Sequence, residues 1–427
     1  RYSLVLTRQP SSRRIPQRLA ESVRTSGGDV MLFDRTLDVL SRAARLRTVA
    51  SRFDKVVLLV HTDDILPILA FGTERFMRPV GLYDHADHLF WIGATIADRV
   101  GELRTSGVEF SRLRRGIENP CLVGIPPERR TAAPGFAPSR RSDLPPVVIS
   151  CGNAEKYRSV MGIDFMKPVE EILRRVPTAQ FVGIGMTFRE FPEWRAVNRR
   201  VGGRIRLLGS VPYDSLLAYY DTAAVYLDSR PMAGGTALTD ALCRGCPVLS
   251  YPGPVGQMDW VFDSPALCRS DEELADRAVE ILLKKVDVEA LLRQESAAYA
   301  RHNCPDLFKG RVAHFLSALT GPHRLRTISP QFNGLSELDN YHYAMNSGRE
   351  TVWRGFGRLL NVHYEVSPLA RRKVVEVFGL RFCVPAKMTS CMLPPRSCLA
   401  LCSPSTHLTA SATLLFPLPF GPTIPVI

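Results

Sequence analysis

Along much of the chain, short apolar runs alternate with longer stretches in which apolar positions recur every three or four residues. The short runs at residues 2–7, 29–33 and 55–60 predict buried strands, and the periodic stretches at 16–25 and 36–52 predict helices between them. This order predicts a mostly parallel sheet, in which ligands bind beyond the carboxyl ends of the strands. We therefore expect the chain to open with an α/β domain.

The same alternation returns in the second half of the chain. Residues 147–150 predict the first strand of a second sheet, and further strands are expected at 180–185 and 204–208. Helices are expected at residues 163–175, up to Tyr220 with Asp214 as the N-cap, and at 271–284, 288–301 and 307–319. The pattern thus predicts a second α/β domain of similar construction.

The boundary between the domains is predicted by a change in composition. Residues 128–146 are dense in Pro, Ala, Ser and Arg and have no apolar period, which is typical of a linker. We therefore expect domains at residues 1–127 and 147–320.

Three other stretches carry further predictions. Residues 92–104 predict an amphipathic helix, and a further helix is expected near residues 370–378. The basic residues Arg112, Arg114 and Arg115 predict either a solvated face or a surface for an acidic acceptor or a membrane.

The end of the chain has an unusual composition. Residues 397–427 contain no Asp, Glu, Lys or Arg, and their prolines exclude a long helix or a central strand. A shifted reading frame would give the same composition. We expect residues 321–427 to form an irregular, partly disordered extension.

Residues 223–251 carry the most informative pattern. An apolar run ends at Asp228, Gly234 and Gly235 form a loop, and Thr236 begins a helical pattern that leads to a second apolar run. Glycines before a helix let the backbone approach a ligand, and the helix N-terminus favours phosphate oxygens. Asp240, one turn into the helix, can accept hydrogen bonds from ribose hydroxyls. A nucleotide diphosphate suits this segment, although an ordinary α/β turn gives a similar pattern.

At this point the sequence resembles a known family. Residues 234–242 (GGTALTDAL) and 245–248 (GCPV) resemble the donor-binding segment of GT-B glycosyltransferases. The resemblance implies an α/β fold of two Rossmann-like domains facing a cleft, in which the C-terminal domain binds a nucleotide-diphosphate sugar and the N-terminal domain faces the acceptor. In that family the acid at the place of Asp240, usually Glu, holds the ribose. Many retaining members carry a pair of spaced glutamates here, and their absence from residues 231–240 implies an inverting mechanism.

A second match supports the first. Residues 208–216 resemble the family segment whose backbone reads the nucleobase, and residues 152 and 153 follow the first strand of the second domain, where family members often touch the donor phosphates. The resemblance implies a donor site made by Gly152, Asn153, Gly209, Val211, Gly234, Gly235, Thr236 and Asp240.

Two polar clusters follow strands of the first domain, at residues 61–64 and 84–88. A histidine beside a carboxylate is an economical general base near neutral pH, and inverting GT-B enzymes often use an N-domain histidine to deprotonate the acceptor. His61 and His85 both qualify, and we favour His85 because Asp84 and Asp87 flank it. The carboxylates could instead cap helices, and His88 could pack in the core.

We expect no metal and no cofactor other than the nucleotide sugar as co-substrate. Asp84, His85 and His88 could begin a zinc site, but a remote fourth ligand is not evident.

The composition adds expectations about partners and location. The net charge of +13, mostly from arginine, fits an anionic partner such as a nucleotide sugar or a phospholipid surface, although arginine-favouring codon usage gives the same excess. Nucleic acid is not expected as a partner. Cysteines without framework spacing, and apolar segments too short to span a bilayer, predict a cytoplasmic protein with room for peripheral contact at the inner membrane face.

These patterns together predict a glycosyltransferase of the hexosyltransferase type, acting on an unidentified glycan, lipid-linked or protein acceptor, with inversion and a histidine base. Two alternatives stay open. One is a non-catalytic nucleotide-binding or scaffold protein on a degenerate GT-B fold, and the other is a sugar-nucleotide epimerase with the same two-domain cleft.

Overall fold

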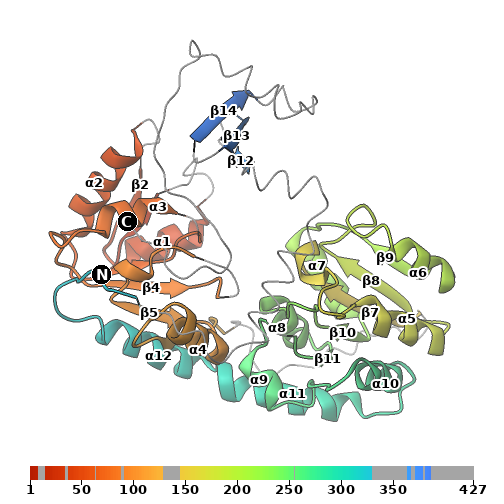
Figure 1. The fold of residues 1–427 in the computed structure, drawn as a ribbon. Coiled ribbons are helices and arrows are strands. Elements are labelled where there is room, and N and C mark those ends of the chain that lie inside the picture. Colours follow the sequence, from red (N-terminus) through yellow and green to blue (C-terminus); the bar gives the residue numbers. More distant parts are fainter. Residues whose placement is uncertain are drawn as a thin grey trace. The chain divides into compact units, whose positions relative to one another are not determined.

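The computed structural model describes residues 1–7, 15–33, 37–62, 64–87, 91–127, 145–253, 255–328, 363–366, 371–377 and 380–385 (Figure 1). The chain divides into two compact units. One contains Arg1–Phe33 and His342–Ile427, and the other is Asp34–Tyr341. The uncharged stretch at residues 397–427 and most of the predicted linker lie outside the described residues.

The first unit begins with a parallel strand pair. β1 (Leu4–Leu6) and β2 (Val30–Leu32) are connected by α1 (Gln17–Thr25), and Leu4 pairs with Val30. Both strands were predicted, but their sheet contains only these two strands among the residues that the structure describes.

The first unit also contains an antiparallel sheet from the C-terminal region. Its strands are β12 (His363–Val366), β13 (Arg371–Val377) and β14 (Leu380–Pro385), with β13 in the centre. The helix predicted near residues 370–378 is therefore wrong. Three valines occur in β13, and β-branched residues favour strands over helices.

The second unit contains two parallel sheets, as the alternating pattern predicted. The first has the order β3 (Val56–Leu58), β4 (Val80–Asp84), β5 (Arg99–Glu102) and β6 (Cys121–Leu122). The helices that connect or follow these strands are α2 (Val39–Ala50), α3 (Ile65–Phe71) and α4 (Thr105–Arg114).

The amphipathic helix predicted at residues 92–104 is wrong. Gly93 has a φ of 120°, a single 3-10 turn, η2 (Ala94–Ile96), follows it, and the chain then enters β5. The Asp98 N–H donates to Val80 O at 2.7 Å, which places β5 beside β4. Consecutive residues of β5 are buried, so both of its faces are covered and the strand lacks the apolar–polar alternation of a half-exposed strand.

The second sheet has the order β11 (Val248–Leu249), β10 (Val225–Leu227), β7 (Val147–Cys151), β8 (Gln180–Ile184) and β9 (Ile205–Leu207), and all strands are parallel. These strands confirm the predicted second α/β domain.

Helices cover both faces of the second sheet, because adjacent residues of a strand point to opposite faces. Val148 belongs to the apolar cluster beneath α5 (Met166–Arg175) and α10 (Asp271–Leu282), whereas Ile149 belongs to the cluster beneath α7 (Tyr213–Thr222), α8 (Thr236–Cys243) and α11 (Val288–Asn303). The helices of this half, most of them visible around the sheet in Figure 1, are α5 (Met166–Arg175), α6 (Trp194–Arg200), α7 (Tyr213–Thr222), α8 (Thr236–Cys243), α9 (Asp259–Phe262), α10 (Asp271–Leu282), α11 (Val288–Asn303) and α12 (Pro305–Ser317). The N-cap of α7 is Pro212 rather than the predicted Asp214, which lies in the first turn.

The last helix, α12, packs against the first sheet. Phe315 and Leu319 lie over Gly81 of β4, where an added Cβ would come within 2.7 Å of both side chains. Glycine in the strand therefore lets the helix approach closely. Although the sequence pattern assigned residues 307–319 to the second domain, this helix connects the two sheets of the second unit.

Beyond α12, His323 anchors the chain on the first sheet. Its Nδ1 lies 2.8 Å from Asp98 Oδ2, its Nε2 lies 2.9 Å from Phe71 O, and the residue is buried. Asp98 also accepts hydrogen bonds from Val80 N–H at 2.8 Å and Arg324 N–H at 3.1 Å. Burial acts to raise the pKa of Asp98, but the hydrogen bonds from His323 and the two backbone amides outweigh it and lower the pKa.

We expect Asp98→Asn to lower the free energy of unfolding by about 1–3 kcal/mol at neutral pH, because a partner of several buried donors is lost. Because the folded pKa of Asp98 lies below its ordinary value, its contribution is present above that value and is lost as the pH falls through the folded pKa. Urea unfolding at neutral and acidic pH measures both effects. An unchanged unfolding midpoint at neutral pH would contradict this role.

Candidate functional site

Backbone hydrogen bonds join the segments at the carboxyl ends of β7, β8 and β9 in the second sheet. Gly152 N–H donates to Ile184 O at 3.0 Å, Gly185 N–H donates to Gly209 O at 2.7 Å, and Gly209 N–H donates to Met186 O at 2.9 Å. Gly185 has a φ of 84°, and an added Cβ would lie 2.4 Å from Gly152 O. The loops that carry the predicted donor residues Gly152 and Gly209 therefore lie on either side of the turn after β8, and each is bonded to it or to the end of β8.

The neighbouring predicted residues lie beside these bonded segments. Asn153 is exposed and Val211 is half-buried, each following directly from a strand end or its glycine turn. The structure thus places Gly152, Asn153, Gly209 and Val211 at one edge of the sheet.

The glycine loop after β10 is organised by a buried carboxylate that the sequence analysis did not select. Asp228 Oδ1 accepts hydrogen bonds from Ser229 N–H at 2.9 Å and Gly234 N–H at 2.7 Å, and Oδ2 accepts one from Ser250 Oγ at 2.8 Å. Burial raises the pKa of Asp228 to about 6, although these hydrogen bonds and Lys156 act to lower it.

This arrangement limits how the glycine loop can meet a ligand. The Gly234 N–H donates to Asp228 Oδ1 inside the protein. Gly235 is the N-cap of α8 and no side chain caps this helix end. The first N–H groups of α8, beginning at Thr236, have no acceptor within the helix. An anion is therefore best placed over Thr236 and not over Gly234.

Asp240 lies on α8 beside a small pocket. The pocket has a volume of about 80 Å³ and is lined by Ile125, Pro126, Thr236, Thr239, Asp240, Met258, Tyr299 and Asn303. Tyr213 Oη donates to Asp240 Oδ2 at 3.3 Å. A carboxylate at a pocket of this size can accept hydrogen bonds from a sugar ring.

Lys156 lies close to the same loop and was missed by the sequence analysis. It belongs to η3 (Ala154–Tyr157), and its Nζ lies 3.5 Å from Ala233 O. Burial lowers the pKa of Lys156, against the attraction of Asp228, and the charge of Arg104 lowers it further. A partly desolvated ammonium group beside an open helix N-terminus is a suitable counter-charge for a phosphate. Its place three residues after Asn153 was the available signal.

The two candidate histidines lie at the carboxyl edge of the first sheet, and both are exposed. His85 follows β4 in a turn that is closed by a hydrogen bond from Ala86 N–H to Asp84 Oδ1 at 2.9 Å. The loops that carry His61 and His85 are joined, because Ile92 N–H donates to Thr62 O at 3.0 Å. The structure therefore brings the candidates to one region.

The flanking residues of these histidines have structural partners. Asp64 caps α3 by accepting a hydrogen bond from Leu66 N–H at 3.1 Å. The alternative capping residue Asp63 and the neighbouring His88 lie outside the described residues.

Asp87, predicted to assist the base, forms a two-pronged ion pair with Arg104. Arg104 Nε donates to Asp87 Oδ2 at 2.7 Å, and Nη2 donates to Oδ1. The remaining Nη1 of Arg104 donates to Gly256 O in the loop after β11. Asp87 thus positions an arginine that reaches the second sheet.

Asp84 belongs to a buried cluster with Arg115. Arg115 Nη1 lies 2.8 Å from Asp84 Oδ2 and 3.7 Å from Glu102 Oε1, and its guanidinium lies 4.6 Å from the centre of the Trp91 ring. Arg115 is therefore buried, which corrects the prediction of a wholly solvated basic face. Glu102 is fully buried, and burial followed by repulsion from Asp84 raises its pKa well above its ordinary value.

We expect the stability of the chain to fall as the pH rises from about 5 to about 8, because Glu102 binds its proton more tightly when folded. A raised folded pKa contributes stability below the unfolded pKa and loses it as the pH rises through the folded value. Glu102→Gln should reduce this fall in melting temperature. An equal pH slope in the variant would show that Glu102 is ionised in the folded chain.

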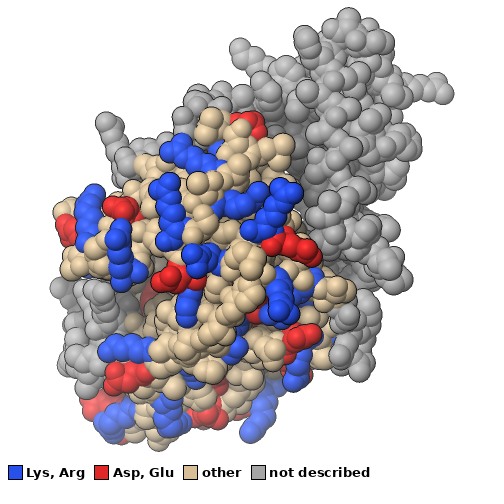
Figure 2. Space-filling view, turned by 90° about the vertical axis from the view of Figure 1, so that its left-hand side faces the viewer, with Lys and Arg blue, Asp and Glu red and all other residues tan. Residues whose placement is uncertain are grey.

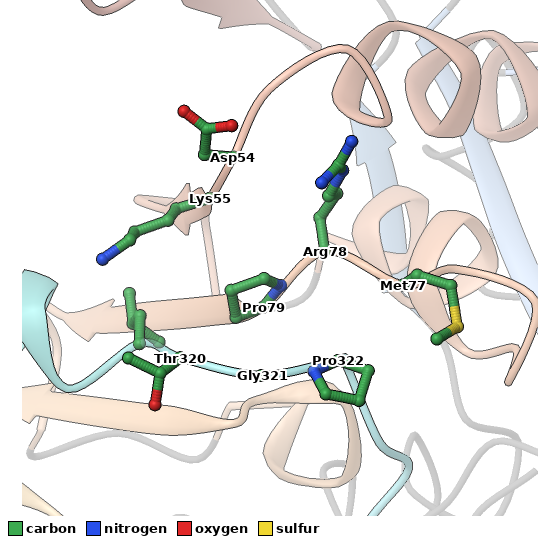
Figure 3. Close-up of a pocket in the computed structure, with 9 residues that line it drawn as sticks. Asp54, Lys55, Met77, Arg78, Pro79, Thr320, Gly321 and Pro322 are labelled. Carbon is green, nitrogen blue, oxygen red and sulfur yellow. The ribbon is translucent and has the colours of Figure 1, made fainter.

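A second hollow lies at the opposite edge of the first sheet (Figure 3). It has a volume of about 410 Å³ and is lined by Asp54, Lys55, Met77, Arg78, Pro79, Leu319, Thr320, Gly321 and Pro322. Residues 55 and 79 precede β3 and β4, so this hollow lies at the amino ends of the strands. Lys55 Nζ already donates to Leu316 O at 2.6 Å. The hollow therefore lies at the opposite ends of the strands from the predicted site residues.

No protein-family model matches the sequence, and no curated protein matches it. The chain is nevertheless similar to solved structures. The apo form of the lipopolysaccharide outer core galactosyltransferase WaaB is 13% identical, with a TM-score of 0.50 over 75% of this chain and 100% of that chain. Anabaena HepE in complex with UDP and glucose is 13% identical, with a TM-score of 0.50 over 70% of this chain and 88% of that chain.

A mutant of the Thermobaculum terrenum O-GlcNAc transferase is 19% identical, with a TM-score of 0.49 over 74% of this chain. This chain spans 61% of the length of that transferase. At 13% identity and a TM-score of 0.50, the similarity to WaaB and HepE establishes the fold and not the activity. The chain has the GT-B fold with two Rossmann-like domains, as the sequence resemblance implied.

In the described part of the chain, every helix is too short or too polar to cross a lipid bilayer.

Proposed function

We propose that this protein is a glycosyltransferase that takes a sugar, of the hexose class, from a nucleotide diphosphate. The observation that carries the proposal is the grouping of Lys156, the uncapped end of α8 and Asp240 at the carboxyl edge of the second sheet. The group offers a cation and N–H donors to phosphates and a carboxylate to a sugar ring. The GT-B fold and the UDP bound to HepE support this use of the site.

In this proposal each part of the donor has its own set of partners. Lys156 and the N–H groups from Thr236 onward hold the phosphates, and Asp240 accepts hydrogen bonds from the ribose. The backbone from Gly209 to Val211 reads the nucleobase, and Gly152 and Asn153 lie beside the phosphates. The roles of these residues rest on the sheet edge that they share.

The proposed acceptor side lies at the carboxyl edge of the first sheet. His85 is the preferred base for an inverting transfer, because its turn is held by Asp84 and its side chain is exposed. Asp87 supports this region through Arg104. His61 remains the alternative base, since its loop is bonded to the segment after His85. We propose no metal ion in the reaction.

The cysteines and the surface charges bear on the location and the partners. Six cysteines in the described residues are thiols and not disulfides, which supports a cytoplasmic location. Figure 2 shows basic side chains spread among acidic ones on the face that it presents. We propose peripheral membrane contact through the basic side chains, and an acceptor among glycans, lipid-linked sugars and proteins.

We expect Asp240→Ala to weaken nucleotide binding by about 1–3 kcal/mol, because the ribose hydroxyls lose their acceptor. A thermal-shift panel of UDP, ADP and GDP first identifies the nucleotide, since a ligand that prefers the folded chain stabilises it. Calorimetry then compares the variant with the wild type, and Glu280→Ala, exposed on α10, is the control. Unchanged affinity in the Asp240 variant would remove this residue from the site.

We expect His85→Ala to lower turnover about a hundredfold or more while nucleotide affinity stays constant, as the loss of a general base does. Steady-state kinetics with the donor found in the panel measures this effect, and His61→Ala is the matched variant. If only the His61 variant loses turnover, the base is His61. An enzyme that tolerates both changes does not use a histidine base. Nucleotide binding without any transfer would favour the non-catalytic alternative.

A further inference from the structure

The glycine loop between β10 and α8 is held by more than one internal bond. Ala233 N–H donates to Val255 O at 2.9 Å, and Ser229 Oγ donates to Met232 O at 2.8 Å. These bonds fix the middle of the loop. The segment that leads into α8 is bonded separately, through Gly234 N–H and Asp228 Oδ1 at 2.7 Å.

Asp228 is suited to this task by its chemistry. An ionised carboxylate only accepts hydrogen bonds, and here it accepts from two backbone N–H groups and one hydroxyl while it is fully buried. An added Cβ on Gly234 would lie 2.7 Å from Asp228 Oδ1, so the loop lies as close to the carboxylate as a glycine permits. The hydrogen bond and the close approach to Asp228 Oδ1 therefore together set the position of Gly234.

We propose that Asp228 is a positioning residue for the diphosphate, which acts by holding Gly234 so that the first N–H groups of α8 face the phosphates. Asp228 itself touches no part of the donor. This inference rests on the proposed function and extends it, because it assigns the phosphate part of the affinity to a buried residue behind the loop. The nucleoside part of the ligand depends on Asp240, one turn further along α8, and on the loop after β9.

The hydrogen-bond network predicts which substitution is tolerated. Ser250 Oγ lies 2.8 Å from Asp228 Oδ2 and 3.0 Å from Gln257 Oε1, and its single proton can serve only one of them at a time. In Asp228→Asn the amide oxygen can accept from Ser229 and Gly234, and the amide NH₂ can donate to Ser250, which then donates to Gln257. Asparagine therefore keeps the loop in place, whereas alanine releases Gly234.

The test compares two ligands in the full-length chain. The nucleoside diphosphate that binds most tightly among UDP, ADP and GDP is measured by calorimetry against its matching nucleoside. We expect Asp228→Ala to lower diphosphate affinity at least about tenfold and to change nucleoside affinity by less than about twofold. We expect Asp228→Asn to stay within about threefold of the wild type for both ligands.

Two further variants distinguish a specific loss of diphosphate affinity from a general loss of folding. Gly234→Ala should also lower diphosphate affinity and spare the nucleoside, because its Cβ would displace the loop from Asp228. Asp98→Asn, another buried carboxylate that accepts backbone N–H bonds but lies in the first sheet, should lower stability and leave both affinities unchanged.

Each outcome separates the possibilities. Equal loss for diphosphate and nucleoside in both Asp228→Ala and Gly234→Ala would overturn the proposal, because the role would then be general stability. An asparagine variant as weak as alanine would overturn it too, since charge and not hydrogen bonding would be responsible. A wild-type chain that binds no nucleoside diphosphate would refute the proposed function, and this inference with it.

Discussion

Buried carboxylates at the ends of strands impose the main constraint on this structure. Asp84 ends β4, Glu102 ends β5, and Asp228 follows β10, and each is buried. A carboxylate removed from water is costly unless donors surround it or a proton neutralises it. Many of the donors come from the loops that follow the strands, while Ser111 and Arg115 come from α4 and its C-cap. The same bonds that satisfy these carboxylates therefore also set the shapes of the loops that form the candidate site.

The three carboxylates are satisfied in different ways. Asp84 binds Arg115 and the Trp91 N–H, at 2.8 Å and 2.6 Å. Asp228 uses backbone N–H groups and a serine, so its loop takes a fixed path. Glu102 shares Arg115 with Asp84 and retains its proton more tightly, which reduces the number of buried charges. Arg115 thus pairs with buried carboxylates of the first sheet and not with a ligand.

Hydrogen bonds between the two sheets also depend on carboxylates. Arg104 is held by Asp87 at the first sheet and donates to Gly256 O after the second. Beside it, Thr105 donates from its N–H and its Oγ1 to the Asp259 carboxylate, at 3.1 Å and 3.0 Å. Burial lowers the pKa of Lys156 and the charge of Arg104 lowers it further, so an anionic ligand beside this amine would favour its charged form. The GT-B fold brings these groups together, and the chemistry of their side chains determines which ligands the carboxyl edge of the second sheet can bind.

The sequence by itself determined the parallel α/β architecture, the second domain and the glycine segment with Asp240, because these depend on local periodicity and on glycines before a helix. It did not separate a buried strand from a helix at residues 92–104, since a strand covered on both faces loses its alternation. Only the tertiary structure showed that Gly234 N–H bonds Asp228, that Arg115 is buried, and that Lys156 lies beside the loop. These facts depend on pairing between residues far apart in the chain, and no local pattern of charge or hydropathy specifies which donor meets which carboxylate.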